Sequence, residues 1–288
     1  MSRPSPPIWL RILARPGLSR VIGRLVRWRA PGLVLRAAIR WFSRLYGVEL
    51  QEARLPIEAY DCFQSFFTRE LAEGLRPIDG EPSRMPSPCD GVLSVFGGLG
   101  QGVLVQAKGI EYSLDALLGD APDADPYRGG GYAVVYLAPH NYHRVHAPWR
   151  GELTHWRYLP GDLYPVNATG VSRVPALFAR NERIVGHFET EFGKAAMIMV
   201  GATCVGHMTV SFADVAANAG HPASGRVTLS EPVHFERGDE FGVFQMGSTV
   251  VLVFERSDFE LVGALGGEVS LGEAVLSLPQ SGDEQESG

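Results

Sequence analysis

The feature that most constrains the fold is a succession of short β-rich runs, many of them bounded by glycine and proline, that begins after Pro88. The runs are Gly91–Phe96, Gly102–Ala107, Tyr132–Ala138, Glu152–Tyr158, Ile184–Phe192, Ala195–Phe212, Arg226–Phe235 and Phe241–Glu255. Helical segments do not alternate with these runs, which argues against a parallel sheet built from βαβ units. The sequence therefore predicts an α+β protein with a mainly antiparallel β core and few helices in its body.

Two helices are expected in that body. A helix is predicted from Leu55 to Leu71, and a shorter one over Ser113–Leu118 with Ser113 as its N-cap. The chain of 288 residues is 45% apolar, which is enough to bury a sizeable core. The polar and acidic end, residues 280–288, is expected to be disordered.

Charge divides the chain into a basic arm, residues 1–50, and an acidic body. The arm contains ten arginines and the single acid Glu49, a net charge of +9, whereas the rest of the chain carries −15. Such an arm indicates an anionic partner surface, either a membrane or a nucleic acid. No base-reading module is visible, so nucleic acid is not an expected partner.

The basic arm holds two amphipathic helical patterns. The apolar positions of the first are Leu18, Val21, Ile22, Leu25 and Val26, and those of the second are Val34, Ala38, Trp41, Phe42 and Leu45. Arginines occupy a different face of each predicted helix: Arg20, Arg24 and Arg27 in the first, and Arg36, Arg40 and Arg44 in the second. Neither pattern has the roughly 18 uninterrupted apolar residues of a membrane-spanning helix, and arginine interrupts every candidate core of a secretory signal. We expect helices that lie on an anionic membrane surface; packing of both helices on the body, with arginine facing water, is the alternative.

The cysteines do not indicate a disulfide framework. Cys62, Cys89 and Cys204 are odd in number, far apart and form no C-x-x-C pair. A cysteine zinc site is therefore not expected either, and a reducing compartment is the simplest interpretation.

Three of the eight histidines, His140, His143 and His146, lie at a spacing of three between Pro139 and Pro148. The prolines disfavour a helix, and on a strand His143 would point away from the other two. At most two of them could then bind one ion, so no metal site is predicted. Acid–base catalysis is the more natural role because histidine changes charge near neutral pH, and surface histidines on a basic strand are the alternative.

Two further segments supply an aspartate and a serine. Ser87-Pro-Cys-Asp-Gly91 is typical of a turn, in which Asp90 would cap its own backbone. Gly247-Ser248-Thr249 lies between two strongly apolar runs, where glycine marks a bulge or a close backbone approach. An aspartate, a histidine and a serine could together form an activated hydroxyl, but their spacing alone does not bring them together in space.

Taken together, these motifs closely resemble the phosphatidylserine decarboxylase proenzyme family of the bacterial, pyruvoyl-dependent type. The resemblance rests on Ser87-Pro-Cys-Asp-Gly91, Tyr142-His-Arg-Val-His-Ala-Pro148 and Met246-Gly-Ser-Thr249, in this order and at these separations. Phe66-Phe-Thr-Arg-Glu-Leu71 and Arg76-Pro-Ile78 are similar to the family segment ahead of its aspartate motif. Met246 stands where the family usually has leucine, a substitution that conserves volume and apolarity.

The resemblance implies that the protein makes its own cofactor. By carry-over, Asp90 orients His146, His146 deprotonates Ser248, and the Ser248 oxygen attacks the carbonyl of Gly247. The chain is then cut between Gly247 and Ser248 into a β chain, residues 1–247, and an α chain, residues 248–288. Ser248 becomes a covalent pyruvoyl group, the cofactor and Schiff-base site, and His143 is the family's candidate proton donor in decarboxylation.

The implied function is conversion of phosphatidylserine to phosphatidylethanolamine and CO2 in phospholipid biosynthesis. The catalytic domain would span residues 51–279, and the protein would bind the cytoplasmic face of the cell membrane peripherally as an α/β heterodimer that pairs into a homodimer. Three alternatives stay open: a Ser-His-Asp hydrolase with an uncut chain, a related pyruvoyl decarboxylase acting on another serine-headed lipid, and a non-catalytic lipid-binding β module.

Overall fold

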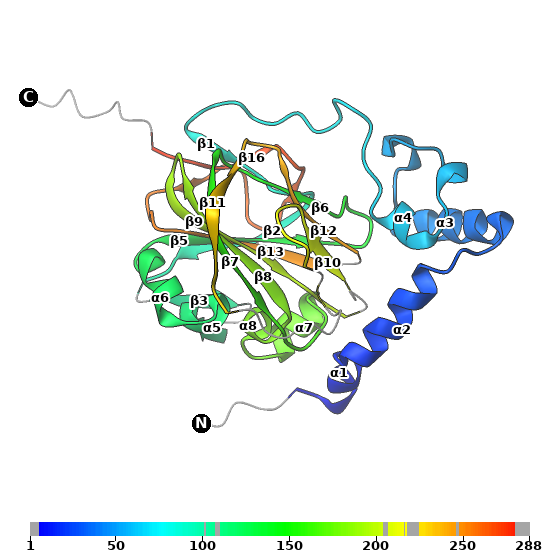
Figure 1. Cartoon of the computed structure of the whole chain (residues 1–288), viewed down its shortest axis with the longest axis horizontal. Helices are drawn as coiled ribbons and strands as arrows, with labels where there is room; N and C mark the ends of the chain where they lie inside the picture. Colours follow the sequence, from blue (N-terminus) through cyan, green and yellow to red (C-terminus); the bar gives the residue numbers. More distant parts are fainter. Residues whose placement is uncertain are drawn as a thin grey trace, which may run out of the picture.

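A computed structural model describes residues 6–100, 102–106, 110–203, 207–215, 217, 225–245 and 248–279. Within them a β-sheet body carries a helical arm along one side (Figure 1). The α-helices are α1 Ile8–Leu13, α2 Pro16–Val26, α3 Gly32–Tyr46, α4 Phe63–Phe67, α5 Leu114–Leu118, α6 Ala121–Ala124, α7 Ala168–Arg173 and α8 Leu177–Arg180. The 3-10 helices are η1 Leu50–Glu52, η2 Ile57–Ala59 and η4 Asp125–Tyr127.

The strands confirm the prediction of an α+β protein with an antiparallel core. They are β1 Arg84–Pro86, β2 Gly91–Gly98, β3 Val103–Gln106, β4 Ile110–Ser113, β5 Gly131–Leu137, β6 Arg144–His146, β7 Gly151–Leu159, β8 Arg183–Thr190, β9 Gly193–Val200, β10 Met208–Val210, β11 Val227–Phe235, β12 Glu240–Phe244, β13 Ser248–Phe254, β14 Glu260–Leu261, β15 Glu268–Val269 and β16 Ala274–Ser277. In the described residues the largest sheet has the order β11-β7-β8-β9-β13-β5-β2-β15, and its strand pairs are antiparallel.

Strand β13 lies inside this sheet, with β9 on one side and β5 on the other. All seven of its residues, from Ser248 to Phe254, are buried. A strand covered on both faces has no solvent side, which explains why its sequence is a continuous apolar run instead of an alternating one. The residue that opens β13 is therefore held firmly within the core of the protein.

Smaller sheets complete the body. Strands β10, β12 and β6 form one three-stranded sheet, and β1, β16 and β14 form another. The predicted run Ala195–Phe212 is therefore not one strand: its first half is β9 of the large sheet, and β10 pairs with β12 instead.

The prediction of one helix from Leu55 to Leu71 is wrong in its length. Only η2 and the five-residue α4 form there, with Tyr60 in an extended conformation between them. The reason is local, because Cys62 and Ser65 form a capping box that begins a new helix at Phe63. The helix after Ser113 is confirmed, since the Ser113 hydroxyl accepts a hydrogen bond from the Ala116 amide at 3.2 Å.

The helical patterns of the arm are confirmed by α2 and α3. Helix α1 docks on the body, where Leu10 and Ala14 join the main core. Phe42 of α3 packs against Phe63 and Phe67 of α4, so it does not share the exposed face of Trp41 as the pattern suggested. In the described part of the chain, no helix combines the length and apolar character needed to cross a bilayer.

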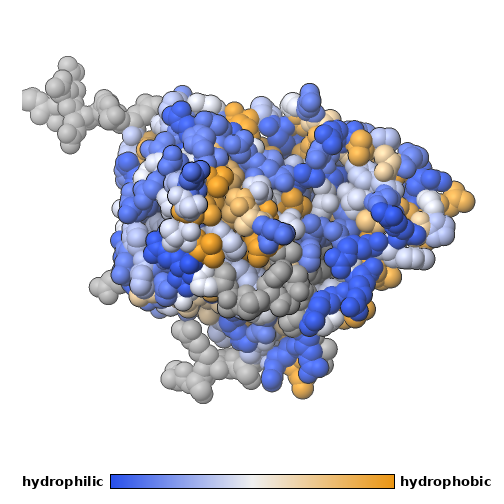
Figure 2. Space-filling view, viewed as in Figure 1, coloured by the Kyte–Doolittle hydropathy of each residue, from blue (hydrophilic) through white to orange (hydrophobic). Residues whose placement is uncertain are grey.

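Apolar side chains nevertheless remain exposed along the arm. They are Ile8, Trp9, Val21, Leu25, Trp28, Leu33, Val34, Trp41, Leu45 and Tyr46. Figure 2 shows hydrophilic and hydrophobic surface side by side along the projecting helices. The body does cover Leu35, Ile39 and Phe42 of α3, so the alternative of packing on the body accounts for one face of that helix but not for these exposed positions. Gly247, Met246, Cys204 and the acidic tail 280–288 lie outside the described residues.

Candidate active site

Ser248 is the first residue of β13 and lies opposite Leu137 of β5. Its side chain is completely buried, and its Oγ has no hydrogen-bond partner within the described part of the chain. A buried hydroxyl without a partner costs about 1–3 kcal/mol of folding free energy. Packing alone does not explain such a residue, which marks Ser248 as a functional candidate.

His146 closes β6 and pairs with Glu240 of β12. Its ring Nδ1 lies 2.8 Å from the carbonyl oxygen of Gly238, and its Nε2 lies 3.2 Å from the hydroxyl of Tyr142. A carbonyl can only accept, so Nδ1 carries the proton and Nε2 presents its lone pair. Burial lowers the pKa of His146, which keeps the imidazole neutral. The ring is therefore in the protonation state of a general base.

The turn before β12 creates the acceptor for that ring. Gly238 has a φ of +91°, a left-handed conformation that favours glycine, and its amide donates to the Ala147 carbonyl at 2.8 Å. The turn is thereby tied to the segment that follows His146. Gly238 belongs to none of the motifs identified in the sequence, so the sequence did not indicate that its carbonyl would accept the hydrogen bond from His146.

Asp90 is bound to residues other than His146. Its Oδ1 and Oδ2 accept hydrogen bonds from Nε and Nη2 of Arg76, each at 2.9 Å, and Oδ1 also accepts from the Leu271 amide at 2.8 Å. The expected carboxylate–imidazole hydrogen bond is thus absent among the described contacts, and Gly238 occupies the Nδ1 position. The Asp90 segment reaches His146 through the backbone, because the His146 amide donates to the Pro88 carbonyl at 2.8 Å.

Gly91 explains why the Asp90 turn fits so closely against the sheet. A Cβ added at Gly91 would lie 2.4 Å from the backbone oxygen of Tyr136. Only glycine permits this approach of β2 to β5, and it fixes where Asp90 emerges. The sequence suggested that Asp90 would cap its own turn, but its backbone partner, Leu271, comes from the distant carboxyl-terminal segment.

His143 lies just before β6 and is completely buried. Its ring stacks on Phe67 with a centroid separation of 4.1 Å, and its Nε2 donates to the Pro139 carbonyl at 3.4 Å. Burial lowers the pKa of His143 to about 3, so the ring is neutral. Its own carbonyl accepts from the Phe244 amide at 2.9 Å, four residues before Ser248. His143 is thereby held beside the segment that leads into the serine.

Arg69 was not singled out by the sequence except as part of a longer motif. Its guanidinium is buried and donates from Nη2 to the His140 carbonyl at 3.2 Å. Nε and Nη1 have no hydrogen-bond partner among the described residues, and the guanidinium lies over the ring of Phe66. A buried cation with two free donors is well suited to bind an anionic group.

Comparisons with known proteins show the family to which the chain belongs. The family described as phosphatidylserine decarboxylase matches residues 63–277. A phosphatidylserine decarboxylase proenzyme from Anaeromyxobacter sp. (strain K) is 45% identical over 92% of this chain and 95% of its own length. The proenzyme of Myxococcus xanthus (strain DK1622) is 42% identical over 85% of this chain and 88% of its own. Another proenzyme, from Shewanella halifaxensis (strain HAW-EB4), is 43% identical over 85% of this chain and 87% of its own length. The chain therefore belongs to the phosphatidylserine decarboxylase family and is a decarboxylase.

Proposed function

We propose that the protein cuts itself between Gly247 and Ser248 and then converts phosphatidylserine to phosphatidylethanolamine and CO2. The observation that carries the proposal is the buried hydroxyl of Ser248 at the start of β13, which has no hydrogen-bond partner among the described residues. A hydrolase needs this serine to meet an external substrate in the uncut chain, whereas self-cleavage of the uncut chain needs only the preceding peptide bond. Complete burial therefore favours self-cleavage.

The proposed cleavage uses the neutral ring of His146. Its Nε2 takes the proton of Ser248, after giving up the hydrogen bond from Tyr142, and the serine oxygen attacks the carbonyl carbon of Gly247. The peptide C–N bond breaks, which leaves an ester and frees the Ser248 amine. Loss of the α-proton and of the Gly247 carboxylate then leaves dehydroalanine. Hydrolysis releases ammonia and leaves a pyruvoyl group at the new amino end.

The fold is suited to hold such a group after the cut. Residues 248–279 include β13, β14, β15 and β16; β13 is paired on both sides, β15 pairs with β2, and β16 pairs with β1. These pairings would keep the α chain joined to the β chain without the peptide bond. The covalent group would begin β13, where the buried Ser248 side chain already lies among residues shielded from water.

The pyruvoyl group supplies an electron sink for the bond that breaks when CO2 leaves. We assign to Arg69 the binding of an anionic group of the substrate, because its Nε and Nη1 donate to no residue in the part of the chain that the structure describes. We assign to His143 the return of a proton to the substrate. In this structure the ring is neutral and its Nε2 proton is bonded to the Pro139 carbonyl, so His143 would have to take up a second proton, on Nδ1, before it could act as the general acid.

The arm would place this site at the lipid surface. Val21, Leu25 and Trp28 are exposed on and just beyond α2, and arginines lie among them. Basic residues near an anionic leaflet contribute about 1 kcal/mol each, and exposed apolar side chains add affinity by entering the interface. We propose peripheral binding to the cytoplasmic face of the cell membrane, with a homodimer of α/β heterodimers as the assembled form.

The intact mass of the purified protein tests the proposal. Wild type should give two chains, 1–247 and 248–288, the second with a blocked amino end, and Ser248→Ala should give one uncut chain. Thr249→Ala is the matched control, since Thr249 is also buried and its hydroxyl also lacks a partner among the described residues. This variant should be cut normally.

An uncut wild type that still acts on phosphatidylserine would contradict the proposal and favour a hydrolase. Lipid product analysis makes the remaining distinction. Cleavage with formation of phosphatidylethanolamine supports the proposed substrate, whereas cleavage without it favours a related decarboxylase with another serine-headed lipid.

A further inference from the structure

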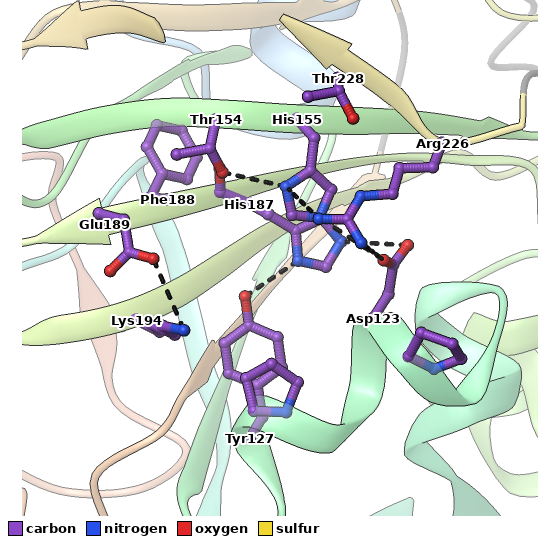
Figure 3. Close-up of a pocket in the computed structure, with 12 residues that line it drawn as sticks. Asp123, Tyr127, Thr154, His155, His187, Phe188, Glu189, Lys194, Arg226 and Thr228 are labelled. Atoms are coloured by element: carbon purple, nitrogen blue, oxygen red, sulfur yellow. Dashed lines mark hydrogen bonds and ion pairs between the residues drawn. The ribbon is translucent and has the colours of Figure 1, made fainter.

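A second polar cluster lies on the large sheet, outside the site described above (Figure 3). His155 of β7 and His187 of β8 are directly opposite one another, and their rings stack at 4.2 Å with an interplanar angle of 7°. Asp123 of α6 faces both rings. Its Oδ1 is 3.6 Å from Nε2 of His155, and its Oδ2 is 3.9 Å from Nε2 of His187.

The contacts of His187 accommodate a tautomer with the proton on Nδ1. When the Tyr127 hydroxyl donates its one proton to the Ala195 carbonyl, at 3.2 Å, it accepts from Nδ1 of His187, at 2.9 Å. Nε2 of His187 is then left with a lone pair directed at Asp123.

The same reasoning applies to His155. The Thr154 hydroxyl donates to the His187 carbonyl at 3.2 Å, so it accepts from Nδ1 of His155 at 3.0 Å. The competing approach of Arg226 Nη2 to that nitrogen is longer, at 3.5 Å. Nε2 of His155 is therefore also a lone-pair atom. In both rings an oxygen atom thus accepts from Nδ1, the nitrogen that points away from Asp123. Metal-binding histidines are oriented by the same kind of hydrogen bond on the nitrogen that does not bind the metal.

Three acceptor atoms thus converge, and the donor nearest to them apart from Arg157 is the partly exposed guanidinium of Arg226, whose Nη1 lies 3.4 Å from Oδ1 of Asp123. Oδ1 of Asp123 and Nε2 of both histidines are buried and lack hydrogen-bond partners in the described residues. These ligand atoms lie within 4.8 Å of one another. The neighbouring arginines offset part of the repulsion among these acceptors, and a metal ion at their centre would satisfy all three.

The neighbouring charges leave room for that cation. Arg157 donates from Nε to Oδ2 of Asp123 at 2.7 Å, which orients the carboxylate and leaves Oδ1 facing the histidines. Arg226 lies 3.4 Å from Oδ1, but its side chain is 46% exposed and can turn outward into water. Lys194 is engaged by Glu189 at 3.7 Å. The cluster opens into a cavity of about 280 Å³ that can hold a water or a small anion.

We propose that Asp123, His155 and His187 form a binding site for a divalent transition metal, with Zn²⁺ as the best match. Two imidazole nitrogens and one carboxylate oxygen suit Zn²⁺, whereas Mg²⁺ and Ca²⁺ prefer oxygen alone. Tetrahedral bonds of about 2.0–2.1 Å place ligand atoms roughly 3.3 Å apart. Oδ1 of Asp123 and Nε2 of His155 are 3.6 Å apart, and all the ligand atoms lie within 4.8 Å of one another, so side-chain shifts would bring the set to this value. The fourth position faces the cavity.

The position of the cluster indicates a structural role. His187 pairs with Ala196, which pairs with Val253, five residues along β13 from Ser248. This separation corresponds to roughly 17 Å along the strand. The metal would join β7, β8 and α6, and it would not contact the reacting atoms.

Metal titration of the untagged, full-length protein tests the proposal, after treatment with a chelator. Wild type should bind one equivalent of Zn²⁺, measured by competition with a chromophoric chelator, and should melt at a higher temperature with the metal. Asp123→Asn and His187→Gln should weaken binding at least 100-fold. His234→Gln is the matched control, because His234 is an exposed histidine of β11 paired with Glu236, and it should bind like wild type.

Co²⁺ provides a second measurement that needs no variant. Wild type should give the intense visible absorption of tetrahedral Co²⁺, and added Zn²⁺ should abolish it. Equal binding by wild type and Asp123→Asn would overturn the proposal, as would an absence of binding by wild type. In the latter case the acceptors share a proton or water. Because every readout is binding, the result is independent of whether the chain cleaves itself.

Discussion

Arg76 and Asp90 form a two-point ion pair, in which both carboxylate oxygens accept from the same guanidinium at 2.9 Å. The remaining donors of Arg76 contact Glu52, so the pair also connects η1 to the start of β2. Asp90 in turn accepts from the Leu271 amide, which would belong to the α chain after cleavage. The carboxylate therefore joins three segments, and its hydrogen bonds hold the β chain against the α chain.

We predict that Arg76→Met destabilises the protein by about 3 kcal/mol, because removing one partner leaves a largely buried carboxylate unpaired. Self-cleavage should slow in the same variant, since Pro88 next to the Asp90 turn holds the His146 backbone. Urea unfolding in the Ser248→Ala background and gel analysis of cleavage measure the two effects. Arg84→Met is the control, because the Arg84–Asp79 pair is long, at 3.4 Å, and half exposed. Equal stability of the two variants would contradict the prediction.

We predict that Arg69→Met raises the KM for phosphatidylserine by about 10- to 100-fold, the equivalent of one charged hydrogen bond. Self-cleavage should be largely spared, because the contacts that Arg69 makes within the protein, to the His140 carbonyl and the Phe66 ring, involve neither Ser248 nor His146. Arg69→Lys should recover part of the affinity. Arg54→Met, which removes an exposed arginine paired with Glu70, is the control. The assignment fails if kcat falls in Arg69→Met while KM stays at the wild-type value.

His143 should make the protein sensitive to acid. Its folded-state pKa of about 3 lies below the ordinary value of 6.5, so the unfolded chain binds a proton that the folded chain refuses. Its contribution to the free energy of unfolding is therefore greatest above pH 6.5 and falls by about 1.4 kcal/mol per pH unit down to pH 3. Between pH 7.5 and pH 5 this amounts to about 2 kcal/mol.

The variant His143→Gln should lack that part of the pH dependence. Urea unfolding at pH 7.5 and pH 5 in the uncut Ser248→Ala background measures it, and the slope with pH stays informative even where the variant is less stable overall. His234→Gln should keep the wild-type slope, because His234 is exposed. Identical slopes for His143→Gln and its parent would show that His143 does not bear the shifted pKa.

Membrane binding should depend on the arginines of α2 and on Arg27, the residue that follows this helix. Reversing Arg20, Arg24 and Arg27 to Glu should weaken binding to anionic vesicles on the order of 100-fold or more, at about 1 kcal/mol per basic residue lost. Self-cleavage should be unchanged. Reversing three body arginines, Arg150, Arg173 and Arg256, makes the same change in net charge and is the control. Unchanged sedimentation of the α2 variant with vesicles containing phosphatidylserine would count against the proposal.

Sequence patterns predicted the β-rich body and the two arm helices, and the family resemblance then singled out Asp90, His146 and Ser248 among the residues that could carry chemistry. These features depend on local periodicity, on turn residues and on short motifs, all of which are visible in neighbouring positions. The helix expected over 55–71 failed because Cys62 and Ser65 cap a new, shorter helix. The prediction that Phe42 shares a face with Trp41 was also wrong. Periodicity identifies an apolar side chain but does not identify the surface that covers it.

The partners of the candidate residues were decided by the tertiary structure. Asp90 meets Arg76 and Leu271, and His146 meets Gly238, across separations in sequence that no motif spans. The cluster of Asp123, His155 and His187 had no motif either, because adjacent antiparallel strands bring together two histidines 32 positions apart and a short helix covers them. Local pattern determines which elements form and which side chains carry chemistry. Only long-range packing determines which of those side chains meet, because burial and hydrogen-bond satisfaction are properties of the whole fold.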